Sequence, residues 1–244
     1  MASFSRLRAC WAAPLLTFLG TALVVPLTWP QVASAQGATV SSVIASAKGA
    51  ITKQTGVHLL VYSHVGSSVE SLVGDLGVKR GIETITQNKD TVTIELTPSY
   101  AYVKGNEPGL TSIMGFSASQ AKKIGNEWVS VKAGTSQYTS LASGLDTSSL
   151  AGLLPDVKGT TLSVEKAKPV DLFLLKWTSA ATSSSPQLTH TLTLAAVGDT
   201  LPVEQSTVAA NGSTETAAFS KWGEAVRVSA PPARSTIPYS TLAS

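Results

Sequence analysis

Short segments whose apolar residues recur at every second position dominate this chain and limit what it can fold into. In residues 90–96, Val92, Ile94 and Leu96 share one face, and polar residues alternate with them. A period of two is typical of a β-strand with one buried face, whereas an amphipathic helix needs a period near 3.6. The same pattern predicts strands at residues 57–64, 100–104, 128–132, 161–166, 172–177, 188–194, 203–208 and 215–221.

Turn signals, rather than crossover helices, separate many of these strands. They include Asn88-Lys89-Asp90, Gly105-Asn106, Gly198-Asp199 and Asn211-Gly212. Closely spaced short strands without strand–helix–strand alternation favour antiparallel pairing. We therefore predict an α+β fold built on one large curved antiparallel sheet, a half-open β-barrel.

A small number of helices should accompany the sheet. Residues 39–52 carry apolar side chains at helical spacing, and residues 109–116, 117–124 and 147–154 are compatible with short helices. Ser117 and Thr147 are placed to cap two of them at the N-terminus. We expect helices inserted between particular strands to cover the concave face of the sheet.

The first thirty-five residues have the order of a secretory signal peptide. Arg6 and Arg8 precede an apolar run, and a small-x-small motif ends at Ala35, which predicts cleavage between Ala35 and Gln36. Cys10, the one cysteine, comes before the apolar run, so it is not placed as the lipid-bearing residue of a lipoprotein. The predicted organisation is a signal peptide at 1–35, one domain at 36–230 and a flexible tail at 231–244.

Charge and cysteine content exclude several classes of function. Removing the two signal arginines leaves 16 basic against 15 acidic residues, a balance that does not indicate a nucleic-acid partner. Loss of Cys10 with the signal leaves neither a disulfide nor a thiolate nucleophile. The predicted compartment is extracytoplasmic, in the cell envelope or the medium.

Catalytic candidates are poor. The chain has three histidines but no metal-ligand spacing, no Gly-x-Ser-x-Gly elbow and no phosphate-binding glycine loop, so we predict no enzyme activity and no cofactor. His190 lies in an apolar strand, where it is either a satisfied core residue or a polar contact in a ligand cavity. A hydrolase would need His190 or His64 within hydrogen-bond reach of a serine and a carboxylate.

One block of sequence has a distinctive order of elements: a strand and turn at residues 99–106, apolar helical segments at 110–124, and a strand headed by Trp128. A later part combines Leu201-Pro202-Val203 with Phe219-Ser220-Lys221-Trp222-Gly223. In these features the chain resembles the exported lipid carriers of the LppX/LprG type in actinobacterial envelopes, which are similar in fold to LolA and LolB. The resemblance spans most of residues 36–230, and its motifs are structural.

The resemblance implies a monomeric, exported carrier that holds the acyl chains of a lipid or glycolipid between sheet and helices. Transient contact with envelope membranes or a membrane partner would load and unload it. This chain departs from such carriers because it lacks their lipid-anchoring cysteine motif. The residues predicted to form the cavity and its lid are Val92, Ile94, Leu96, Leu110, Ile113, Met114, Phe116, Leu150, Leu154, His190 and Leu192.

Two questions stay open at this level. The segment 110–116, with Met114 and Phe116, is either a mobile lid over the cavity or an ordinary cap on the core. The same fold also serves an alternative function, an envelope sensor or interaction module without a transport role. An exposed apolar patch outside the cavity would favour that alternative.

Overall fold

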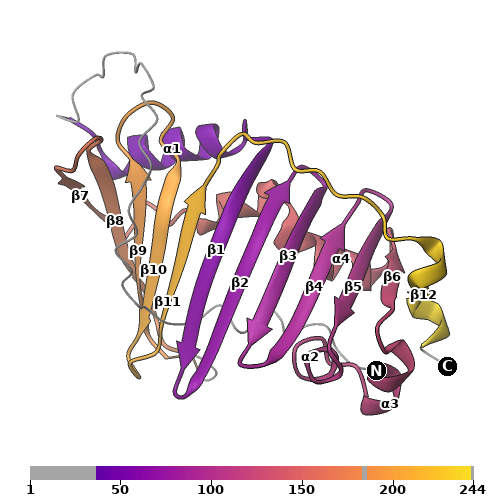
Figure 1. Ribbon diagram of the computed structural model, residues 1–244. Coiled ribbons are helices and arrows are strands. Elements are labelled where there is room, and N and C mark those ends of the chain that lie inside the picture. The colour runs from indigo at the N-terminus through magenta and orange to yellow at the C-terminus, as the bar shows by residue number, and fades with distance from the viewer. Residues whose placement is uncertain (1–36, 183–185, 243–244) are drawn as a thin grey trace.

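The computed structural model describes residues 37–182 and 186–242. These residues form one twelve-stranded sheet with helices on one side (Figure 1). Within them, no helix is long and apolar enough to cross a membrane. The predicted signal peptide, with Cys10 and the cleavage site between Ala35 and Gln36, lies outside the described residues.

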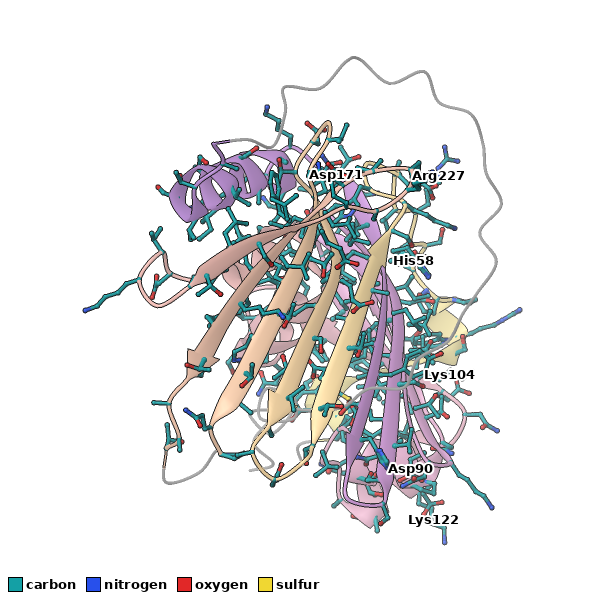
Figure 2. The ribbon with its side chains drawn as sticks, turned by 90° about the vertical axis from the view of Figure 1, so that its left-hand side faces the viewer. His58, Asp90, Lys104, Lys122, Asp171 and Arg227 are labelled. Atoms are coloured by element: carbon teal, nitrogen blue, oxygen red, sulfur yellow. The ribbon has the colours of Figure 1, made fainter. Side chains whose placement is uncertain are left out.

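The sheet is curved and does not close, and its edges are β7 and β12 (Figures 1 and 2). The strand order is β12-β6-β5-β4-β3-β2-β1-β11-β10-β9-β8-β7. Every neighbouring pair is antiparallel except β12 and β6, which run parallel. The bounds are β1 Gly56–Val65, β2 Ser68–Gly77, β3 Arg80–Gln87, β4 Asp90–Leu96, β5 Tyr100–Gly105, β6 Trp128–Lys132, β7 Thr161–Glu165, β8 Leu172–Ser179, β9 Leu188–Ala195, β10 Pro202–Ala209, β11 Thr214–Ser220 and β12 Thr236–Pro238.

All of the predicted strands are present, and β4 and β6 have the predicted bounds. The chain also contains two long central strands, β2 and β3, that the sequence pattern did not reveal. In β2 the positions facing the helices are Glu70, Leu72, Gly74 and Leu76, so charge and glycine interrupt the apolar alternation. The predicted α+β half-barrel is confirmed, with one parallel pair at its edge.

Helices cover the concave face. α1 (Val40–Ile51) lies over β8 and β9, and α4 (Ser136–Leu145) lies behind β3 and β4 (Figure 1). α2 (Glu107–Ser112) and α3 (Ala118–Ile124) pack at the β4–β6 end, and a 3₁₀ helix, η2 (Thr147–Leu153), follows α4. Thr39 caps α1 through a capping box, and Ser117 caps α3 in the same way, as predicted.

Two helix predictions need correction. Asp146, not Thr147, caps η2, because its Oδ1 accepts a hydrogen bond of 2.9 Å from the Ser148 amide. Helix α4 was not predicted, because its sequence, SQYTSLASGL, is rich in serine and has few apolar residues with helical periodicity. Tertiary contacts hold it instead: Leu141 and Leu145 are buried against the sheet.

The C-terminal segment as far as Leu242 lies against the sheet, which corrects the prediction of a flexible tail for residues 231–242; residues 243–244 lie outside the described residues. After β11 the chain runs along one end of the sheet to the β6 edge (Figure 1). There it forms η3 (Ala233–Ser235), β12 and η4 (Tyr239–Thr241), and Leu242 is buried beside them. Gln120 Nε2 donates a hydrogen bond of 2.8 Å to the Leu242 carbonyl. Pairing with β6 and apolar burial therefore outweigh the loop-like composition of the segment.

Three apolar clusters make up the core. The first joins α2, α3 and α4 to β3–β6, the second lies under η2 at β1, β2 and β11, and the third joins α1 to β8 and β9. Val92, Leu96, Leu110, Met114 and Phe116 belong to the first cluster, and Leu192 belongs to the third.

Candidate ligand cavity

A cavity of about 410 Å³ lies between the middle of the sheet and the pair formed by α4 and η2. Strands β1, β2, β3, β4 and β11 form one wall. Its volume falls within the range of small-molecule binding sites. The apolar part of the lining is Val61, Leu72, Leu76, Ile85, Ile94, Leu141, Leu150 and Leu153.

Strand register brings the apolar residues of the sheet wall together. Val61 of β1 pairs with Leu72 of β2, and Leu72 pairs with Ile85 of β3, so the three side chains form one row across the sheet. Because alternate residues of a strand point to opposite faces, all three are directed toward the helices. This row makes the floor of the cavity apolar.

Small residues on the opposite wall keep the space open. On α4 the cavity is lined by Ser140, Ser143 and Gly144, and on η2 by Ser149 and Gly152. A Cβ atom built at Gly144 or Gly152 meets no heavy atom within 4 Å, so a larger side chain would have room there. The composition that hid α4 from sequence analysis is thus the reason why the cavity exists.

Three carboxylic acids also line the cavity: Glu70 of β2, Glu83 of β3 and Glu215 of β11. Glu83 and Glu215 are only 8% and 5% exposed. Loss of solvation and, to a smaller extent, the charge of Glu70 together raise the pKa of both to about 7. Burial also raises the pKa of Glu70, whose Oε2 accepts a 3.4 Å hydrogen bond from Gln87.

Two of the acids belong to a polar row that crosses the covered face. Cross-strand pairing places its members in the order His190, Thr207, Glu215, Ser63, Glu70 and Gln87. The row of Val61, Leu72 and Ile85 lies beside it, two residues along each strand. The cavity therefore has a polar edge along an apolar floor.

Both ring nitrogens of His190 take part in hydrogen bonds. Its Nε2 shares a hydrogen bond of 3.0 Å with Ser179 Oγ, its Nδ1 shares one of 3.1 Å with Thr207 Oγ1, and its ring stacks on Trp177 at 4.9 Å. Burial lowers its pKa, which favours the neutral imidazole. His190 is not part of the cavity lining.

A hydrolase site at His190 would need a serine and a carboxylate, and the hydrogen-bond partners of this histidine are Ser179 and Thr207. Thr207 takes the position that a carboxylate would need in order to stabilise an imidazolium ion. His58 does meet a carboxylate, Asp75, at 2.7 Å, but on the outer face of the sheet, on the side away from α1 (Figure 2). In the described parts of the chain, no group of three or more His, Cys, Asp or Glu residues is arranged to hold a metal ion.

The structure brings together only part of the predicted site. Ile94 and Leu150 line the cavity, whereas Leu154 borders a separate surface pocket beside β8. The remaining predicted residues do not line the cavity: Val92, Leu96, Leu110, Ile113, Met114, Phe116, His190 and Leu192. Met114 is 3% exposed, packed among the helices and β4, and a lid role for segment 110–116 stays a prediction.

Sequence reasoning missed the acids, although a signal for them exists. Glu215 is in phase with Ala217 and Phe219, which are buried, and Glu83 is in phase with Ile85. A carboxylate on the apolar phase of a strand indicates a charged group directed into the protein. That pattern would have pointed to both residues before the fold was known.

Comparison with known proteins supports the fold. No protein-family model matches the chain, and no curated protein is similar to it in sequence. Among solved structures, LprF from Mycobacterium bovis aligns with a TM-score of 0.53 and 12% identity, over 79% of this chain and 96% of its own. The chain has the LppX/LprG-type fold. The lipoprotein LppX of Mycobacterium tuberculosis aligns with a TM-score of 0.49 and 16% identity, over 78% of this chain and 98% of its own.

Proposed function

We propose that this protein is an exported carrier that holds the acyl part of a lipid or glycolipid in the cavity between the sheet and α4–η2. The observation that carries the proposal is a cavity of about 410 Å³ with an apolar floor on the covered face of an LppX/LprG-type fold. Eight apolar side chains line it, five from the sheet and three from α4 and η2, and glycines and serines on α4 and η2 leave it open.

The driving force would be burial of hydrocarbon. Each methylene group transferred from water to an apolar wall contributes about 0.8 kcal/mol, so a single chain supplies substantial affinity without polar contacts. This suits a carrier, because affinity built from many equal contributions tolerates variation in chain length. The residues that would contact the chain first are Val61, Leu72 and Ile85 on the sheet and Leu150 on η2.

The remaining parts of the proposal concern the protein's setting. The signal peptide would direct the chain out of the cytoplasm, and the mature protein would act as a monomer of one domain beginning at Gln36. Without an anchoring cysteine, it would move between envelope membranes or a membrane partner by diffusion. We propose no enzyme activity and no cofactor for it.

The test compares two glycine substitutions. Gly144→Trp places an indole in the cavity, and Gly49→Trp places one at an exposed, equally open position on α1. Residues 36–244 of each variant and of the wild type are purified from the native host and studied by native mass spectrometry with organic extraction. A copurifying acyl lipid in the wild type and in Gly49→Trp, but not in Gly144→Trp, supports the carrier. Wild-type protein without lipid, and without uptake of offered lipids, contradicts it.

One observation favours the sensor or interaction module as a second candidate. On the outer face of β1 and β2, Tyr62, Val69 and Val73 are each more than 40% exposed, and strand pairing places them close together. An exposed apolar patch of this kind is typical of a surface that binds a partner protein. An empty cavity in the mass spectrum, together with loss of envelope association in Tyr62→Ser, would favour this candidate over the carrier.

A further inference from the structure

We propose that the cavity selects amphiphiles with a cationic, hydrogen-bond-donating head, such as an alkyl amine, and that Glu83 and Glu215 bind that head. The inference rests on the proposed carrier function and names the ligand class of the same cavity. It follows from the position of the two carboxyl groups, their lack of partners and the charge of the wall.

Both carboxyl groups are buried and face the cavity without a protein partner. Glu83 and Glu215 are more than nine-tenths buried, and both line the cavity. Within residues 37–182 and 186–242, neither side chain makes a hydrogen bond or an ion pair. Among the described residues, the enclosed side-chain atoms without a hydrogen-bond partner are Glu127 Oε2 and Thr216 Oγ1, so the carboxyl oxygens of Glu83 and Glu215 remain accessible from the cavity. A ligand that donates hydrogen bonds would supply the missing partners.

The surrounding charges favour a cation. Among the described residues of the wall, Glu70, Glu83 and Glu215 are the titratable groups, and no Lys, Arg or His joins them. Of the neighbouring groups, His190 is already bound to two hydroxyl groups, and Asp146, at the α4–η2 junction, accepts hydrogen bonds from the Lys79 and Ser148 amides. The field inside the cavity therefore becomes negative as these carboxyl groups ionise. An anionic head would meet three carboxyl groups, and a neutral head would leave their charge uncompensated.

The apolar floor determines where the rest of the ligand lies. Glu83 pairs with Ile94 across β3 and β4, and Glu215 lies one row from Val61 and Leu72. A head held by the carboxyl groups thus leaves its chain against apolar side chains. The cavity is complementary to an amphiphile, rather than to a hydrophilic cation such as a free metal ion.

The affinity of the cavity for an amine should rise with pH. Because burial raises the pKa of Glu83 and Glu215 to about 7, the empty cavity holds protons that an ammonium head would displace. A carboxyl group of pKa near 7 passes from mostly protonated to mostly ionised between pH 6 and pH 8, so affinity for an amine should rise about tenfold over this range. Affinity for an alcohol should fall or stay constant.

The experiment measures binding of three probes with the same chain: dodecylammonium, 1-dodecanol and dodecyl sulfate. Titration calorimetry of residues 36–244 at pH 6, 7 and 8 gives the dissociation constants, with the two ionic probes kept below their critical micelle concentrations and dodecanol below its solubility limit. We expect dodecylammonium to bind most tightly at pH 8, and dodecyl sulfate to bind least tightly. The double variant Glu83→Gln, Glu215→Gln should remove the pH dependence of dodecylammonium binding and weaken that binding about tenfold. The same change at exposed Glu165 is the matched control.

The outcomes separate this inference from the carrier function. If dodecanol binds but dodecylammonium shows no preference and no rise with pH, the head-group inference is wrong and the carrier stands. If dodecyl sulfate binds as tightly as the amine, the inference is also wrong. If none of the probes binds, the carrier function fails, and the inference fails with it. The comparison of probes uses wild-type protein, so it does not depend on folding of the double variant.

Discussion

Replacing Glu83 with glutamine should make the folded protein less sensitive to pH. The ordinary pKa of a glutamate is 4.5, and burial in the cavity raises that of Glu83 to about 7. A raised carboxyl pKa means that the folded state holds the proton more tightly than the unfolded state. The resulting stabilisation is complete below pH 4.5 and is lost as the pH rises to 7. The difference of about 2.5 pH units corresponds to about 3 kcal/mol.

Glutamine has nearly the same shape as glutamate and does not ionise, so Glu83→Gln avoids burying a charge at high pH. We expect the variant to match the wild type within about 1 kcal/mol at pH 4.5 and to exceed its free energy of unfolding by up to about 3 kcal/mol at pH 8. Urea denaturation at half-unit steps from pH 4.5 to 8 measures both curves. Glu165→Gln, on the exposed face of β7, should run parallel to the wild type. Parallel curves for Glu83→Gln and wild type would refute the reasoning, because Glu83 would then titrate equally in both states.

Two further predictions test packing and helix capping at the β4–β6 end of the fold. Leu242→Ala should lower the free energy of unfolding by about 2–3 kcal/mol, because Leu242 is 3% exposed in the first core cluster. Urea denaturation measures the change, and a loss below about half a kcal/mol would mean that the C-terminal segment does not pack against the sheet. Asn106→Ala should cost about 2 kcal/mol, because the side chain caps α2 through Gly109 and also bonds to Thr91 and Lys89, and an unchanged thermal midpoint would contradict this.

The strands that sequence analysis found are those with one apolar and one polar face. In β4, Val92, Ile94 and Leu96 alternate with polar residues, and the predicted bounds are the observed ones. β2 escaped prediction because Glu70 and Gly74 occupy two of its inward positions. Its place in the sheet is determined by pairing with β1 and β3, which are long-range contacts that no local pattern contains.

The cavity was harder to predict than the sheet, for a geometric reason. Val92, Ile94 and Leu96 are equivalent in sequence and all belong to the first core cluster, yet of the three only Ile94 also lines the cavity. What distinguishes them is the position of helices that come later in the chain. A one-dimensional pattern shows which face of a strand is covered, but it does not show whether the covering side chain is a leucine or a glycine.

The unfavourable features of this fold occur together, and that coincidence is the strongest argument that the cavity has a function. Glycine within a helix costs about 0.5–1 kcal/mol relative to alanine, and Gly144 and Gly152 both face the cavity with room for a side chain. Alanine or leucine at either position would stabilise the helix and begin to fill the space. The unpartnered acids Glu83 and Glu215 lie in the opposite wall. Selection for stability alone would fill the space beside the two glycines and replace the two acids. A bound amphiphile would instead fill the space and give the carboxyl groups hydrogen-bond partners.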